Sequence, residues 1–167
     1  MFAFERGHDY ADRDALVCEL AGAVQETLAL RIQDAIRRAE RNHAPLTPQS
    51  RLVAFARGYV TFAINEPAWF DLLCRGHAQR ATSRPAGDHT QPSPHELLQA
   101  ALDDLIATGV IPQQRAHDAI WMIWAALDGS TRLASDGPLQ AWSRARLATF
   151  VEQTIGIVLT GLTSSRP

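Results

Sequence analysis

Residues 12–41 read DRDALVCELAGAVQETLALRIQDAIRRAER. Aliphatic side chains recur here at every fourth position, at Leu16, Leu20, Val24, Leu28, Ile32 and Ile36. Because an α-helix has about 3.6 residues per turn, side chains four positions apart lie on one face of it. Asp12 belongs to the residue types that cap helix N-termini. The stretch therefore predicts one long helix over 12–41 with a single apolar stripe.

The same helical pattern returns after each Pro or Gly further along the chain. Thr47 followed by Pro48 predicts the start of a second helix, which runs to about Asn65, because Thr caps a helix and Pro is tolerated in its first turn. Its apolar residues cover more than one face, which predicts an inner helix. Pro67 is expected to open a short third helix, and Gly76 to end it.

The rest of the chain predicts a loop and three more helices. Residues 77–93 have no period and predict an exposed loop. The expected helices run from Ser93-Pro94 to Gly109, from Pro112 to near Gly137, and from Pro138 to Leu162. No window alternates with period two, as a half-buried strand would. The predicted fold class is all-α, a helical bundle of about six helices with short connections.

Composition favours one globular domain and excludes several classes of protein. The 167 residues are 46% hydrophobic and 20% charged, which is enough for a buried core. A net charge of −2 argues against a general nucleic-acid or membrane-surface binder. No apolar run approaches about 18 residues, so neither a membrane span nor an export signal is expected. All 16 basic residues are Arg, which we interpret as the codon bias of a GC-rich bacterial genome.

The last two predicted helices are apolar over an unusually wide arc. Residues 155–159 make the last helix apolar nearly all round, although a terminal helix normally has one solvated face. We expect a second copy of the chain to cover it in a two-fold, four-helix interface. The alternative is that this helix forms the centre of the monomer core. The expected interface residues are Ile123, Leu127, Phe150, Val151, Ile155, Val158, Leu159 and Leu162.

Three motifs resemble those of TetR-family transcriptional regulators. Tyr10, Asp12, Arg13 and Leu16 follow one another as at the junction after that family's recognition helix. The segment YVTFAINEPAWF at 59–70 resembles the family's aromatic helix, polar turn, Pro and aromatic pair. The run WAALDG at 124–129 resembles the Trp and His-Gly element of one subgroup, but Asp128 stands where the His would be. A role of that His therefore does not carry over. The likeness spans nearly the whole chain.

The resemblance implies a domain organisation and a partner. Residues 11–167 would form an effector-binding and dimerisation domain, and 1–10 the end of a DNA-binding domain. A helix-turn-helix unit needs about 40 residues, and only about ten precede the match. We therefore expect that this unit is missing and that the chain by itself does not bind operator DNA tightly, since only Arg6 and His8 could contact phosphate there. Regulators of this family act in the bacterial cytoplasm.

An aromatic set is the candidate effector site. In similar proteins the C-terminal helices enclose a cavity for a small apolar or aromatic effector, and aromatic walls with few polar groups suit such a site. Ordinary core packing is the alternative. Asp128, if half-buried, needs a partner, and Arg132 at i+4 is available, while a solvated or capping position is the alternative. The expected ligand-binding residues are Phe55, Tyr59, Phe62, Phe70, Trp121, Trp124 and Asp128, with Trp69 close by in the sequence.

Patterns that indicate catalysis, a cofactor or a metal site do not occur. None of the six His residues is paired with another at i+3 or i+4, and no nucleophile elbow, phosphate loop or dinucleotide fingerprint is present. Cys18 and Cys74 each stand alone among apolar residues. The sequence thus predicts no enzyme, cofactor or metal. The function it favours is the sensing domain of a repressor; the alternative is a stand-alone helical module that forms mixed dimers with a full-length regulator.

Overall fold

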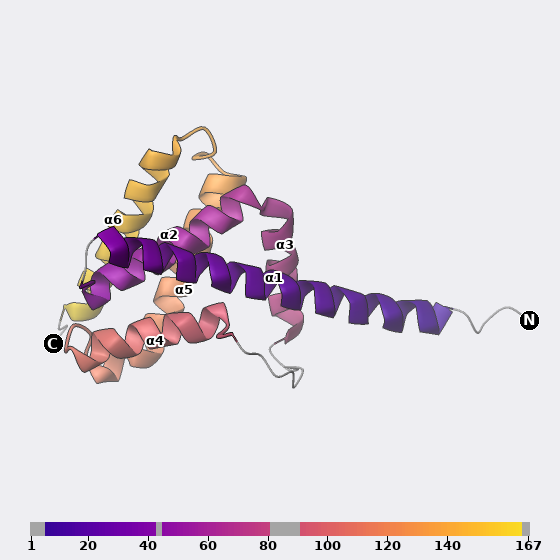
Figure 1. The fold of residues 1–167 in the computed structure, drawn as a ribbon, viewed down its shortest axis with the longest axis horizontal. Helices are drawn as coiled ribbons and strands as arrows, with labels where there is room; N and C mark the ends of the chain where they lie inside the picture. Colours follow the sequence, from indigo (N-terminus) through magenta and orange to yellow (C-terminus); the bar gives the residue numbers. More distant parts are fainter. Residues whose placement is uncertain (1–5, 43–44, 81–90, 165–167) are drawn as a thin grey trace, which may run out of the picture.

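The computed structural model describes residues 6–42, 45–80 and 91–164, and this part of the chain is helical without a strand. Its helices follow in the order α1 (Arg6–Asn42), α2 (Pro48–Asn65), α3 (Pro67–Arg80), α4 (Pro94–Ala107), the short 3-10 helix η1 (Gln113–Arg115), α5 (Ala116–Ser135) and α6 (Arg144–Thr163) (Figure 1). This confirms the predicted all-α bundle. No helix among the described residues has the length and apolar character needed to cross a bilayer.

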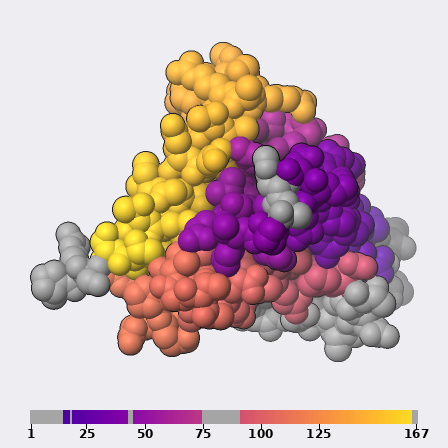
Figure 2. Space-filling view, turned by 60° about the vertical axis from the view of Figure 1, so that its left-hand side comes forward, coloured from indigo at the N-terminus to yellow at the C-terminus, as the bar shows by residue number. Residues whose placement is uncertain are grey.

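Helix α2 is the centre of the bundle and contacts each of the other five α-helices. Leu52 and Phe55 on it are fully buried. Its first turn is capped as predicted, because the Thr47 hydroxyl accepts a hydrogen bond from the Ser50 N–H at 3.1 Å. The prediction of an inner helix is confirmed. In the space-filling view, α6 lies beside α2 along the edge of the molecule (Figure 2).

Helix α1 is long, and only its C-terminal half packs on the bundle. Val24, Leu28 and Ile32 of its apolar stripe are buried, whereas Leu16 is 64% exposed. The N-terminal half extends beyond the other helices (Figure 1). The helix also begins earlier than predicted, at Arg6, so Asp12 lies inside it. No Pro interrupts residues 6–11, and adding one residue to an existing helix costs little.

Boundaries of α3, α5 and α6 also differ from the sequence prediction. Helix α5 begins at Ala116, after η1, rather than at Pro112. Helix α3 continues through Gly76 to Arg80, since an internal Gly costs only about 1 kcal/mol relative to Ala. The predicted loop therefore loses its first four residues to the helix, and 81–90 lie outside the described residues. Helix α6 begins at Arg144 rather than Pro138, because the Ser143 hydroxyl accepts from the Arg146 N–H at 3.3 Å and caps it there.

The ends of α4 follow the prediction. The Ser93 hydroxyl accepts from the Glu96 N–H, and the Glu96 carboxylate accepts from the Ser93 N–H at 2.7 Å, which completes a capping box. Gly109 has φ +72, in the left-handed region that glycine adopts without strain, and it turns the chain after the helix. Leu98, Leu102 and Leu105 of α4 are buried against the core. The capping box and Gly109 thus mark the two ends of this helix in the sequence.

Candidate functional site

Four rings from three helices form an aromatic cluster around Tyr59. The cluster consists of Phe55 and Tyr59 on α2, Phe70 on α3 and Trp124 on α5. Tyr59 meets Phe70 and Trp124 edge-on, with ring centroids 5.5 and 5.4 Å apart, and lies parallel to Phe55 at 6.4 Å. Such arrangements stabilise beyond the burial of area alone. The cluster therefore joins α2, α3 and α5 at one place.

A hydrogen bond between α2 and α5 crosses this cluster. The Tyr59 hydroxyl donates to Asp128 Oδ1 at 2.8 Å, and Asp128 is half-buried. Burial raises the pKa of Tyr59 well above its usual value, and the charge of Asp128 and the hydrogen bond to it act in the same direction. The phenol is therefore a fixed donor at neutral pH. The partner of Asp128 is thus Tyr59, and the expected pairing with Arg132 is corrected accordingly.

Cys74 on α3 lies in the same electrostatic environment. It is half-buried, and burial raises the pKa of its thiol, with a further contribution from the charge of Asp128. A raised thiol pKa means a small thiolate fraction at neutral pH. The residue therefore behaves as a small apolar group, as its sequence context suggests.

Two further polar residues follow Asp128 along α5. Thr131 and Ser135 stand one and two turns after it, and their hydroxyl oxygens are covered without a hydrogen-bond partner in the described part of the chain. Both residues line a cavity of about 110 Å³ between the start of α3 and the end of α5, which we call the α3–α5 notch. Its walls are Pro67, Ala68, Phe70, Asp71, Thr131, Arg132, Ser135 and Asp136.

His95, in the first turn of α4, borders the cluster on another side. Its ring stacks on Trp124 with centroids 6.4 Å apart and planes within 3°. His95 is exposed, so it separates the half-buried Trp124 from solvent. No three His, Cys, Asp or Glu side chains of the described residues gather in a way that could hold a metal ion.

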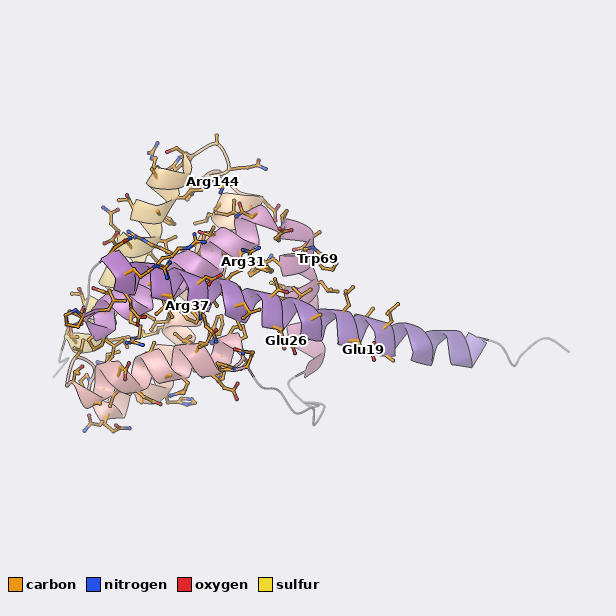
Figure 3. All side chains as sticks on the ribbon, viewed as in Figure 1. Glu19, Glu26, Arg31, Arg37, Trp69 and Arg144 are labelled. Atoms are coloured by element: carbon orange, nitrogen blue, oxygen red, sulfur yellow. The ribbon has the colours of Figure 1, made fainter. Side chains whose placement is uncertain are left out.

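The structure brings five of the seven expected ligand-binding residues together, namely Phe55, Tyr59, Phe70, Trp124 and Asp128. Phe62 is buried but lines a different groove, between α1, α2 and α6, to which Arg31 and Arg144 also belong (Figure 3). Trp121 is 61% exposed and makes no part of the cluster. Trp69 lies on the outer side of α3 (Figure 3). Helical spacing grouped these rings in the sequence, but they point to different faces.

The structure places the expected interface residues in or against the core of the single chain. Six of them, Ile123, Leu127, Val151, Ile155, Leu159 and Leu162, are buried inside the single chain, and Phe150 and Val158 pack against the same core. Side chains that are already covered have no area left for a second copy. Their burial matches the alternative in which α6 contributes to the monomer core.

Other residues on the same two helices are apolar and exposed. Trp121, Met122 and Leu133 on α5 and Ile157 on α6 are exposed, Ile157 to 73%. Open space surrounds the positions where Gly129, Gly156 and Gly161 would carry a Cβ. We call these exposed positions, Trp121, Met122, Gly129, Leu133 and Ile157, the α5/α6 face.

Sequence reasoning missed three residues at the site, which are His95, Thr131 and Ser135. A signal was present for the last two, because they lie three and seven positions after Asp128 and so share its face of α5. Nothing in the sequence linked His95 to Trp124, since they lie on two different helices that are far apart along the chain.

The comparisons with known proteins give a family. The family model described as tetracyclin repressor-like, C-terminal domain, matches residues 52–157, which run from α2 into α6 and include the cluster, the α3–α5 notch and the α5/α6 face. No curated protein and no solved structure matches the chain. The match covers more than half of the chain and agrees with the all-α bundle. The chain therefore belongs to the tetracyclin repressor-like (TetR) C-terminal domain family.

Proposed function

We propose that this chain is the effector-sensing and dimerisation domain of a TetR-like transcriptional regulator of the bacterial cytoplasm. One observation carries the proposal. Helix α5 contributes Trp124 and Asp128 to the aromatic cluster, and it also contributes Trp121, Met122 and Leu133 to an exposed apolar face. A ligand that moves α5 at the cluster therefore also moves the surface available to a second copy.

The cluster supports a two-state mechanism. Its rings are packed against one another, so an effector can enter between α2, α3 and α5 only if the rings move apart. Entry also breaks or replaces the hydrogen bond between Tyr59 and Asp128. A small apolar or aromatic molecule with higher affinity for the opened arrangement shifts the population toward it.

The α5/α6 face supports the dimerisation part. Large exposed apolar residues grouped on one surface are typical of protein interfaces, and Trp and Met are enriched there. The open space at Gly129 lets a second backbone approach closely. A two-fold pairing of this face with itself buries α5 and α6 of both copies in a four-helix arrangement.

Helix α1 supplies the output. Its C-terminal half is held on α2, whose Gly58 allows the two backbones to meet closely, and its N-terminal half extends away from the bundle (Figure 1). A rigid helix fixed at one end converts a small rotation of α2 into a larger displacement of its free end. In a regulator of this family, that displacement acts on a DNA-reading unit.

Two measurements on the same protein test the proposal. Toluene, cyclohexanol and cyclohexane are titrated while Trp fluorescence is recorded, with Trp124→Phe as the variant that lacks the reporter in the cluster. We expect a saturable change that Trp124→Phe largely removes. Sedimentation equilibrium over a wide concentration range is expected to show a dimer. A single-chain mass at the highest concentration, together with no response to any compound, would contradict the proposal.

A further inference from the structure

We propose that the α3–α5 notch binds the uncharged hydrogen-bonding head, an amide, carbonyl or hydroxyl group, of a small effector. This inference rests on the proposed sensing function and adds to it the chemistry of the effector. The aromatic cluster selects only for apolar surface, whereas the notch adds polar groups that distinguish one apolar molecule from another.

Two hydroxyls in the notch are buried without a hydrogen-bond partner. Thr131 is 1% exposed, and neither its hydroxyl nor that of Ser135 has a partner in the described part of the chain. Buried polar groups are nearly always hydrogen-bonded, because an unpaired one is destabilising. Threonines on α6 relieve this by donating to the carbonyl four residues earlier, as Thr154 does to Phe150 at 2.8 Å. Thr131 lacks such a bond, so a ligand group that reaches its hydroxyl from the notch would supply the missing partner.

Charged side chains of both signs surround the notch. The Arg132 guanidinium lines it together with the carboxylates of Asp71 and Asp136. The notch begins at Pro67 and Ala68, the first two residues of α3. Charges of both signs beside the two hydroxyls favour a neutral dipole, since an anion would lie near the two carboxylates and a cation near the guanidinium.

The notch is large enough for a small head group, and it adjoins the aromatic cluster. A cavity of about 150 Å³ takes benzene, so the 110 Å³ of the notch suits a head group of about five heavy atoms. Phe70 lines the notch, and its ring lies 5.5 Å from that of Tyr59 in the cluster. A head bound at Thr131 therefore places the rest of a larger molecule beside the cluster.

The test uses three probes of nearly equal size and different charge. Propanamide, propionate and propylammonium are titrated into the 15N-labelled full chain, and amide shifts are followed at residues 68–71 and 131–136. We expect saturable shifts with propanamide in the millimolar range and clearly weaker ones with both ions. Thr131→Val and Ser135→Ala should each weaken propanamide binding about fivefold to tenfold, the effect of one neutral hydrogen bond. Ser130→Ala, on the same helix but outside the notch, should leave it unchanged.

Several outcomes overturn the inference. These are the absence of saturable shifts at the notch, tighter binding of propionate or propylammonium than of propanamide, and unchanged propanamide binding in both notch variants. None of them touches the sensing and dimerisation proposal, which the response of Trp124 to apolar compounds and the sedimentation mass test separately. Loss of those responses with propanamide still bound would contradict the function and leave the notch in place.

Discussion

Tyr59 is the residue on which the closed arrangement of α2 and α5 depends most directly. In Tyr59→Phe the half-buried carboxylate of Asp128 loses the phenol as a donor, and a hydrogen bond to a charged group is lost with it. We expect the free energy of unfolding to fall by about 1.5–3 kcal/mol at pH 7, as measured by urea denaturation. Asp128→Asn keeps an acceptor for the phenol and should lose less. Equal stability of Tyr59→Phe and the wild type would contradict the role of this bond.

The raised pKa of Tyr59 predicts that the free energy of unfolding falls as pH rises in the alkaline range. The unfolded phenol titrates near about pH 10, and the folded one holds its proton to higher pH. The folded state therefore binds more protons above that pH, so the stability present below it is lost as pH rises. Urea midpoints between pH 9.5 and about pH 11.5 should fall more steeply in the wild type than in Tyr59→Phe. Cys74 and Tyr10 are common to both chains and cancel in the comparison; parallel slopes would refute the prediction.

Substitution of Thr131 is expected to raise the free energy of unfolding, in contrast to substitution of Tyr59. Its hydroxyl is buried without a partner, so Thr131→Val removes an unsatisfied group and should raise the free energy of unfolding by about 1 kcal/mol. Thr154→Val is the matched control, because its hydroxyl donates to the Phe150 carbonyl and the change should stabilise less or destabilise. Thermal melts of the two variants decide between them. A larger loss in Thr131→Val than in Thr154→Val would mean that Thr131 is already satisfied.

At the scale of elements, the close crossing of α1 and α2 at Gly58 determines how firmly α1 is held on the bundle. A Cβ at Gly58 would lie 2.9 Å from the Ile32 Cα, a backbone atom that cannot rotate away. Gly58→Ala should therefore destabilise by about 1–3 kcal/mol despite the better helix propensity of Ala. Gly22→Ala, where nothing lies within 4 Å, should instead gain about 0.5–1 kcal/mol. Chemical denaturation of both variants measures the difference, and equal signs would show that the helices can separate freely.

At the scale of the whole molecule, the α5/α6 face decides the state of association. Ile157→Arg places a charge at the most exposed large apolar residue of that face and should weaken dimerisation by at least about tenfold. Leu30→Arg, at an exposed apolar position on α1, is the control and should not change the sedimentation mass. If both variants behave alike, the proposed interface lies elsewhere on the molecule.

Capping residues and helical periodicity were enough to predict the individual helices. Thr47 and the Ser93–Glu96 pair start helices where the sequence places them, and the apolar residues of α2 identify it as the inner helix. These features depend on neighbours within about four residues, which the sequence displays directly. Gly76 and Pro138 show the limit, because a helix can continue through glycine and a later Ser143 caps more effectively than an earlier proline.

The sequence by itself determined which residues share a face of each helix, and hence the all-α bundle and the family resemblance. Only the tertiary structure decided what each face meets. It buried Ile123 and Ile155 within the chain, left Trp121 and Ile157 exposed, and joined Tyr59 to Asp128 across 69 positions. Helical periodicity is a local property of the chain, whereas the partner of a face depends on how all the helices pack against one another, and that packing is a property of the whole fold.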